Sequence, residues 1–457
     1  MVSNRGPVSF SHGPGGELVP RRGAGGLVSS IGPLLRGTGA TWMAAAMTDA
    51  DREAAGAGVV EAEGFRFRSL DLDPVSFAQY YDVVANATLW FLYHGLADAA
   101  RRPRYDHRWH EAWDGYRRVN EAFARAVVEE APDGAVVLVQ DYHLVLVGRW
   151  LAAERPDLRA VHFHHTPFCD PVALRALPDA VADELLAAAS AYTACGFHAR
   201  RWADRFAACA EARLGGAPPT FVAPIAPDPD DLAEVAASGA CAEALARLER
   251  SLDGRRLILR VDRLELSKNL LRGFWAFDEL LEHHPDLRGE VTFVALCYPS
   301  RESLAEYQAY RLEVEAVADL VNRRWGRPGW TPLVLDTADD FASSVAALRR
   351  YDVLLVNPVR DGLNLVAKEG AMLNEHQGAV VLSTEAGVFD ELGGPALAVN
   401  PYDVSATAEA LARALALEPA ERAARAEALR AAAGARTPRD WLEDQLRAAG
   451  LSASAVA

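Results

Sequence analysis

The chain has 457 residues, of which 50% are hydrophobic and 24% are charged, with a formal net charge of −16. This length exceeds what one hydrophobic core normally organises, so two domains are expected. The negative charge argues against a nucleic-acid-binding surface as the main function. No apolar run reaches the ~18 residues that a membrane span needs, and we expect no membrane partner. The first residues lack the apolar core of a signal peptide, so a cytoplasmic location is expected.

Short apolar runs alternate with longer helical stretches rich in alanine and leucine. Nearly continuous apolar strands separated by helices predict an α/β fold with doubly wound parallel sheets, covered on both faces. The predicted strands are Ala135–Val139, Ala160–Phe163, Phe221–Ala223, Leu257–Val261, Val291–Leu296, Pro332–Leu335, Val353–Val356, Ala379–Leu382 and Ala396–Val399.

Two breaks divide the chain. The segment Ala223–Pro229 carries three prolines, which is typical of a stiff linker. A second connection is expected at 436–438, before an amphipathic helix over Arg439–Ala448. We therefore predict domains over residues 1–224 and 225–436, followed by a C-terminal helical segment over 437–457. Residues 11–26 are rich in glycine and contain two prolines, which indicates a mobile loop.

The strongest functional pattern lies in the second half. The apolar run Val353–Val356 is followed by Asn357–Glu369, which indicates a strand, a turn and the first turn of a helix. The free amides and the positive dipole end of such a helix suit a diphosphate. Arg263 and Lys268 follow another apolar strand, and ligands bind at the carboxyl ends of strands in open α/β sheets. These cations could stabilise a diphosphate leaving group without a metal, although basic side chains at a solvated helix start are also common. Glu369 is either a surface carboxylate or a ligand of two ribose hydroxyls.

The first half carries weaker signals at its own strand ends. The pair Gly25-Gly26 lets a backbone approach a ligand closely, although turns use such pairs constantly. Asp141 follows one predicted strand and His165 follows the next, so both are expected at one site. The neighbouring pair His164-His165 lacks a carboxylate at metal-binding spacing, so no metal is predicted.

Three further residues have both an ordinary and a functional interpretation. Tyr81 and Trp90 could be packing residues, but aromatic rings are also the usual platform for apolar sugar faces. Arg301 could lie on the surface, but an arginine suits a pair of phosphate oxygens.

Taken in order, several motifs resemble the trehalose-6-phosphate synthase family over nearly the whole chain. They are Ser3-Asn4-Arg5, Gly25-Gly26, Asn86-Ala87-Thr88-Leu89-Trp90, Ala112–Tyr116 with Val119-Asn120, Asp141-Tyr142-His143-Leu144, His165–Phe168, Arg263-Leu264-x-x-Ser267-Lys268, Gly329–Pro332, Arg360–Glu369 and Asn400–Asp403. The combination of Arg263-x-x-x-x-Lys268 with Arg360–Glu369 is highly specific.

The resemblance implies the GT-B arrangement, in which two Rossmann-like domains face each other across a cleft and the final helix crosses back to the first domain. It implies glucose transfer from a nucleoside diphosphate glucose, with a uridine or guanosine base, to glucose 6-phosphate. The expected product is α,α-trehalose 6-phosphate with retained configuration. No cofactor or metal is expected. The first domain would bind the acceptor and the second the nucleotide sugar.

The resemblance also assigns roles residue by residue. Arg263 and Lys268 would hold the diphosphate, with Gly25, Gly26 and the backbone of Leu365 and Val366. Glu369 would bind the ribose. Asp361, Asn364 and His165 would hold the transferred glucose. The acceptor and its phosphate would contact Arg5, Tyr81, Trp90, Asp141 and Arg301.

Departures from the family pattern leave alternatives open. The chain begins almost at Ser3, so the family's first strand is expected to be missing or the start site to be set late. The segments Trp42–Ala46 and His165–Cys169 differ from the usual motifs near the sugars. The donor base, the exact acceptor and a homo-oligomeric state stay open. One rival is a related sugar-phosphate or cyclitol-coupling pseudo-glycosyltransferase, and another is a non-catalytic nucleotide-sugar sensor.

Overall fold

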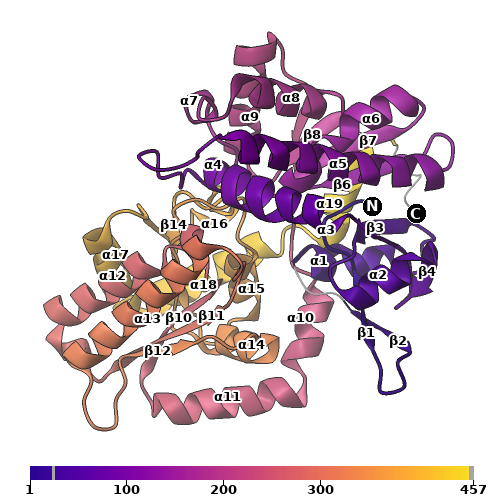
Figure 1. The fold of residues 1–457 in the computed structure, drawn as a ribbon. Coiled ribbons are helices and arrows are strands. Elements are labelled where there is room, and N and C mark those ends of the chain that lie inside the picture. Colours follow the sequence, from indigo (N-terminus) through magenta and orange to yellow (C-terminus); the bar gives the residue numbers. More distant parts are fainter. Residues whose placement is uncertain (23–25, 452–457) are drawn as a thin grey trace. The chain divides into compact units, whose positions relative to one another are not determined.

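The computed structural model describes residues 1–22 and 26–451 (Figure 1). The chain divides into two compact units, one of Met1–Ile225 with the segment from Pro438 onward, and one of Ala226–Thr437. Each unit contains a parallel sheet covered by helices, which confirms the predicted α/β class. Within the described residues, no helix combines the length and apolarity needed to cross a bilayer.

The second unit is built on six parallel strands in the order β12-β11-β10-β13-β14-β15. Their bounds are β10 (Arg256–Arg263), β11 (Val291–Tyr298), β12 (Leu333–Asp336), β13 (Val353–Val356), β14 (Ala379–Ser383) and β15 (Leu397–Val399). The strand order reverses between β10 and β13, and ligands of doubly wound sheets bind outside the carboxyl ends at such a point. The two strands pair only at Ile258–Val353 and Leu259–Leu354, so the chain segments beyond them are free to diverge.

The helices of the second unit follow their strands in a regular alternation. They are α10 (Pro229–Ala236), α11 (Gly239–Leu252), η3 (Leu266–Lys268), α12 (Leu270–His283), η4 (Pro285–Leu287), α13 (Ala305–Trp325), α14 (Phe341–Arg350), α15 (Leu365–Leu373), α16 (Phe389–Leu392), α17 (Val404–Leu415) and α18 (Pro419–Ala433). The core between sheet and helices is apolar, with Phe274, Phe277 and Phe293 packed edge to face.

In the first unit, residues 1–4 complete the sheet. The strands are β3 (Thr41–Ala45), β4 (Val59–Ala62), β5 (Phe65–Leu70), β6 (Val136–Gln140), β7 (Arg159–His164), β8 (Ala194–Phe197) and β9 (Thr220–Val222). Val2 bridges Met43 of β3 and Val139 of β6 in parallel fashion, which joins β4-β5-β3 to β6-β7-β8-β9. This position is again a reversal of strand order, so Asn4 and Arg5 emerge beside the end of β6.

The helices of the first unit include one long π-helical segment. They are α1 (Gly26–Leu35), α2 (Asp49–Ala55), α3 (Pro74–Ala78), η1 (Gln79–Leu89), α4 (Trp90–His94), α5 (His107–Glu130), η2 (Tyr142–Leu144), α6 (Val147–Glu154), α7 (Pro171–Leu174), α8 (Asp179–Ser190), α9 (Arg200–Leu214) and α19 (Pro438–Ala448). The C-terminal helix α19 packs on β7, where the Trp441 ring meets Phe163 edge to face at 5.0 Å.

The N-terminal region departs from the sequence-based prediction. Every strand predicted from residue 135 onward is present, but β1 to β5 and β8 were not predicted. The expected loop over 11–26 is wrong in its first part, because β1 (Val8–His12) and β2 (Leu18–Arg22) form an antiparallel hairpin. The glycines and Pro14 supply the turn between the strands, where Gly16 has a φ of +83° and Gly13 N–H donates to the Glu17 carbonyl at 2.8 Å.

Candidate active site

Two cations stand at the carboxyl end of strand β10. Arg263, the last residue of that strand, is 44% exposed, and its guanidinium lies 3.1 Å from Glu265 Oε1. Lys268 ends the short turn η3, and its Nζ donates to Asp361 Oδ2 at 2.6 Å. Burial would lower the pKa of Lys268, but the carboxylates of Asp361 and Asp262 raise it above its usual value. The ammonium therefore carries its charge at neutral pH.

A buried arginine, Arg260, holds the chain segments around Lys268 and Asp361 in place. Arg260 has no exposed surface, and its Nε donates to Asp262 Oδ2 at 2.8 Å. Its Nη2 donates to Asn357 Oδ1 at 2.7 Å, which ties the chain after β10 to the chain after β13. Asp262 Oδ1 lies 3.8 Å from Lys268 Nζ. The sequence carries one signal for this support, which is a charged residue inside an otherwise apolar strand.

The junction between β13 and α15 has the predicted form. Asn364 adopts a φ of 97°, and its Oδ1 accepts a hydrogen bond from Ala367 N at 3.1 Å. Its Nδ2 donates to Asp361 Oδ2 at 3.2 Å. The amides of Leu365 and Val366 follow, and first-turn amides have no acceptor within their own helix. The two side chains are partly exposed, so solvent reaches this end of α15.

The loop before α15 is held by backbone hydrogen bonds to the loop that follows β14. Asp361 N–H donates to the Glu385 carbonyl at 3.2 Å, and Gly387 N–H donates to the Asp361 carbonyl at 3.0 Å. A side chain at Gly387 would meet the Gly362 carbonyl oxygen at 1.9 Å, so this close approach requires glycine.

Glu369 lies on α15, partly buried. Burial first, and the charge of Asp231 second, raise the pKa of Glu369 to about 7. No hydrogen-bond donor among the described residues satisfies this carboxylate. A carboxylate in this state is suited to accept hydrogen bonds from hydroxyl groups, which is the role the resemblance gives it.

Arg301 shares a carboxylate with Arg263. Glu265 is 1% exposed, and its Oε1 lies 3.0 Å from Arg301 Nη1 as well as 3.1 Å from Arg263 Nη1. The Arg301 guanidinium also lies 5.5 Å from the centre of the Tyr307 ring. The predicted donor cation and the predicted acceptor arginine therefore meet at one buried group. No sequence motif predicted a role for Glu265.

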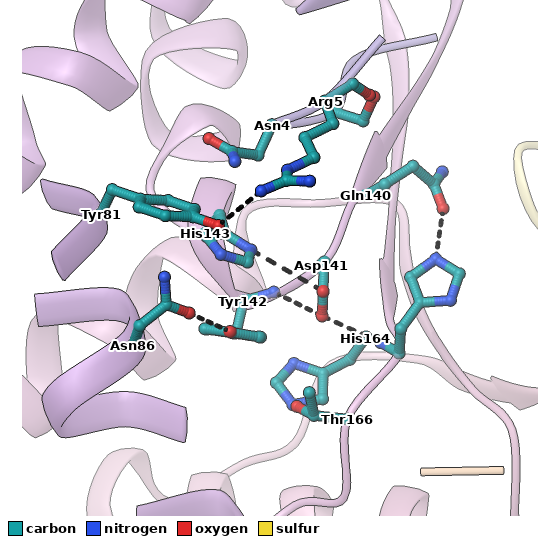
Figure 2. A network of polar contacts seen from close by, with 12 residues as sticks. Asn4, Arg5, Tyr81, Asn86, Gln140, Asp141, Tyr142, His143, His164 and Thr166 are labelled. Carbon is teal, nitrogen blue, oxygen red and sulfur yellow. Dashed lines mark hydrogen bonds and ion pairs between the residues drawn. The ribbon is translucent and has the colours of Figure 1, made fainter. Parts of the chain in front are cut away.

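In the first unit, an aromatic and polar cluster gathers at the end of β6 (Figure 2). Arg5 Nη2 donates to the Tyr81 hydroxyl at 3.3 Å. The Tyr81 ring stacks on Phe77 at 5.6 Å and on His143 at 5.8 Å. His143 Nδ1 lies 3.7 Å from Asp141 Oδ2. The structure thus brings together three of the residues predicted to hold the acceptor, namely Arg5, Tyr81 and Asp141.

Asp141 holds the centre of this cluster. It adopts a φ of 71°, and its Oδ1 accepts from the amides of Tyr142 at 3.0 Å and His165 at 3.3 Å. Burial would raise the pKa of Asp141, but the hydrogen bond and charge of His143 outweigh it and hold the pKa below its usual range. The carboxylate is therefore ionised at neutral pH.

His164 and His165 point to opposite sides, as strand alternation predicts. His164 is 2% exposed among Tyr93, Phe168 and Phe197, and burial lowers its pKa to about 3. His165 is partly exposed, and burial lowers its pKa against the opposing charge of Asp141.

Trp90, Gly25 and Gly26 are not among the predicted residues that these clusters bring together. Trp90 is 1% exposed and stacks on His94 at 4.2 Å, so its ring lies within the core rather than on a surface that could receive a sugar. Gly25 lies outside the described residues, and Gly26 is the first residue of α1. The roles given to these three residues stay predictions.

The residues that could hold a metal are dispersed. Within residues 1–22 and 26–451, no three His, Cys, Asp or Glu side chains come together as a metal-binding group. The chemistry that the two clusters offer is instead fixed charge, helix amides and hydroxyl recognition.

The model of glycosyltransferase family 20 matches residues 1–450. The chain is 32% identical over 444 residues to the trehalose-6-phosphate synthase of Mycolicibacterium smegmatis, covering 91% of this chain and 85% of that one. It is 31% identical over 447 residues to the bifunctional trehalose-6-phosphate synthase/phosphatase of Thermoproteus tenax, covering 91% of this chain but spanning 58% of that longer relative.

Solved structures agree in fold. An α,α-trehalose-phosphate synthase (UDP-forming) from Burkholderia xenovorans, in complex with glucose-6-phosphate, matches with a TM-score of 0.85 at 30% identity, covering 98% of this chain and 99% of that one. A trehalose-6-phosphate synthase studied with bisubstrate glycomimetics, as a case of glycosyl transfer with retention, matches with a TM-score of 0.83 at 30% identity, covering 98% of both chains. These matches confirm the predicted GT-B fold class.

Proposed function

Because the chain belongs to glycosyltransferase family 20, we propose that it moves glucose from a nucleoside diphosphate glucose to glucose 6-phosphate, forming α,α-trehalose 6-phosphate. The observation that carries this proposal is the contact between Lys268 and Asp361, which joins the chain segments after β10 and β13 at the reversal of strand order. The solved relative named UDP-forming supports uridine as the donor base, and its bound glucose-6-phosphate supports the acceptor.

The second unit supplies the donor side of the proposed reaction. Arg263, Lys268 and the first amides of α15 bind the diphosphate, because fixed cations and free N–H groups stabilise phosphate oxygens. Asp361 and Asn364 hold the glucose hydroxyls, and Glu369 accepts from the ribose. In this assignment a phosphate oxygen takes over part of the contact that Lys268 makes with Asp361.

The acceptor side is proposed to draw on Arg5, Tyr81, Asp141 and Arg301. Arg5 is an exposed cation whose direction is set by Tyr81. Asp141 is a carboxylate held ionised, suited to accept from two sugar hydroxyls. Arg301 is held by Glu265, and its fork of donors matches a phosphate group.

The proposed mechanism is a front-face displacement. The bond between the glucose anomeric carbon and the diphosphate oxygen breaks first, and the developing negative charge is stabilised by Arg263, Lys268 and the α15 amides. The acceptor hydroxyl then bonds to the anomeric carbon from the same face and passes its proton to the departing phosphate oxygen. The configuration is retained without a covalent enzyme intermediate. The relative studied for transfer with retention supports this course.

A donor panel tests the function directly. Purified protein is incubated with UDP-, GDP-, ADP- and dTDP-glucose and with glucose 6-phosphate, and the product is identified by NMR. We expect α,α-trehalose 6-phosphate from one or more donors, with turnover unchanged by a chelator. Failure of every donor, or transfer only to a non-sugar cyclitol, would contradict the proposal.

A further inference from the structure

The imidazole of His165 is bonded at both of its ring nitrogens. Its Nε2 lies 2.9 Å from Gln140 Oε1, and its Nδ1 lies 3.1 Å from His198 Nε2. Gln140 Nε2 in turn donates to Gln445 Oε1 at 3.1 Å, across 305 positions of sequence. At the other end, Ile225 N–H donates to His198 Nδ1 at 3.4 Å, and the Ala223 carbonyl oxygen lies at the same distance from that nitrogen. We call the four side chains Gln445, Gln140, His165 and His198 the relay.

Every link of the relay can point the same way. The Ile225 amide donates to His198, His198 Nε2–H to His165 Nδ1, His165 Nε2–H to Gln140 Oε1, and the Gln140 amide to Gln445 Oε1. A neutral imidazole has one donor and one acceptor nitrogen, so each histidine in such a chain has a single allowed tautomer. In this direction His165 carries its proton on Nε2.

The relay is shielded from water at most of its members. Gln445 has no exposed surface, and Gln140 and His198 are 1% and 4% exposed. A hydrogen bond lost there is not replaced by solvent, so the partners hold one another strongly. Gln445 Nε2 and Trp441 Nε1, one helical turn apart on α19, have no hydrogen-bond partner among the described residues. Burying two unpaired N–H donors lowers the stability of the fold. A glutamine that is kept at this position despite that cost is expected to serve a neighbouring residue.

We propose that Gln445, Gln140 and His198 are positioning residues that hold the His165 ring in one orientation and in its Nε2–H tautomer. This inference deepens the proposed function, in which His165 contacts the transferred glucose. A sugar hydroxyl that contacts an imidazole meets either an N–H donor or a nitrogen acceptor. The hydrogen bond made by the other ring nitrogen normally decides which of the two the hydroxyl meets. The C-terminal helix thereby sets the tautomer of a residue that directly follows β7.

The test compares Gln445→Leu with Gln445→Glu, and uses Arg447→Met on the exposed face of the same helix as control. Leucine removes the acceptor for the Gln140 amide, whereas a carboxylate keeps it. The ring tautomer of His165 is read from ¹⁵N chemical shifts of histidine-labelled protein without substrate, assigned with His165→Gln. The kcat and the donor KM are then measured with the donor found active.

We expect a dominant Nε2–H signal in the unmodified protein. Gln445→Leu should mix the tautomers and lower kcat on the order of 10-fold, as loss of an outer hydrogen-bond partner typically does. Gln445→Glu should restore the Nε2–H signal and most of the rate, and Arg447→Met should change neither. A dominant Nδ1–H signal, or a Gln445→Leu variant with unaltered tautomer and rate, would overturn the inference.

A second pair of variants keeps the inference testable if the first variant does not fold. If Gln445→Leu does not fold, His198→Gln and His198→Phe are compared, because a glutamine amide can still donate to His165 Nδ1 and a phenyl ring cannot. Rescue by glutamine alone supports the relay, and equal behaviour of the two refutes it. The tautomer is measured in resting protein, so it reports on the relay even if the proposed glucosyl transfer is not observed.

Discussion

The two units place their polar clusters at equivalent points of two sheets but fill them with different chemistry. In the second unit, cations and carboxylates are joined in ion pairs, as in the contacts of Lys268 with Asp361 and of Arg301 with Glu265. In the first unit, aromatic rings, imidazoles and amides surround one ionised carboxylate, Asp141. The comparison teaches that strand order sets where a ligand can bind, while the side chains at each strand end set what it can be.

The same comparison applies to the backbone. Asp141 in the first unit and Asn364 and Arg301 in the second adopt positive φ. Asp and Asn tolerate this conformation better than other residues, whereas an arginine there is uncommon. In each unit, backbone strain therefore occurs at predicted ligand residues that lie just outside a regular helix or strand.

The largest expected effect is on kcat, and it distinguishes Lys268 from Lys368, the two lysines of the second unit. Lys268→Met should lower kcat on the order of 10²–10³-fold, because a preorganised cation is removed from the leaving diphosphate. Lys368, fully buried against Glu391 at 2.7 Å, serves as the matched control. Lys368→Met should leave kcat of the folded protein unchanged and lower the free energy of unfolding by about 3 kcal/mol. Steady-state kinetics and thermal unfolding measure both, and near-normal turnover of Lys268→Met would refute its assignment.

The next effect concerns the acceptor phosphate. Arg301→Ala should raise the KM for glucose 6-phosphate roughly 10–100-fold, because a charge-assisted hydrogen bond contributes about 1.5–3 kcal/mol. Arg311→Ala is the control, since that arginine forms ion pairs with Glu302 and Glu315 instead of with Glu265. An unchanged KM for Arg301→Ala would place the phosphate elsewhere.

Glu369 offers a pH-dependent test within the donor cluster. Its pKa rises from 4.5 in the unfolded chain to about 7 in the folded one, so the folded state retains its proton over that interval. Stability therefore falls as pH rises from 4.5 to 7, and the full cost is present above 7. Glu369→Gln should match the unmodified protein at pH 4.5 and exceed it at pH 8 by about 3 kcal/mol, since one pKa unit corresponds to about 1.4 kcal/mol. Thermal unfolding across this range checks it, and parallel curves would contradict the assignment.

The smallest effect falls in the first unit. Tyr81→Phe keeps the ring stack on His143 but removes the hydroxyl that accepts from Arg5. The KM for glucose 6-phosphate should rise by roughly 2–10-fold, because one hydrogen bond contributes about 0.5–1.5 kcal/mol. Kinetics under the conditions used for Arg301→Ala allow the two units to be compared. A larger effect than that of Arg301→Ala would reverse the proposed ranking of neutral and charged contacts.

The sequence predicted the parts of the site that depend on local rules. Arg263, Lys268 and the turn before Asn364 were recognisable because strand ends and helix starts follow from short patterns. Glu265 and the relay were not recognisable, since the relay depends on the contact of Gln140 with Gln445, which lie 305 positions apart. The strand β5 was missed although Phe65, Phe67 and Ser69 alternate with more exposed residues, a pattern that periodicity could have identified. The burial of Trp90 depends on long-range packing that no local motif encodes.

The placement of α19 has a consequence for how the protein is made. Trp441 and Gln445 belong to the interior of a unit whose other residues are synthesised more than 200 positions earlier. During translation the second unit is therefore complete before the first can close its core, although domains generally fold in the order of synthesis. Until Trp441 and Gln445 have been made, the first unit lacks the helix that packs on β7, and the apolar surface under this helix stays open.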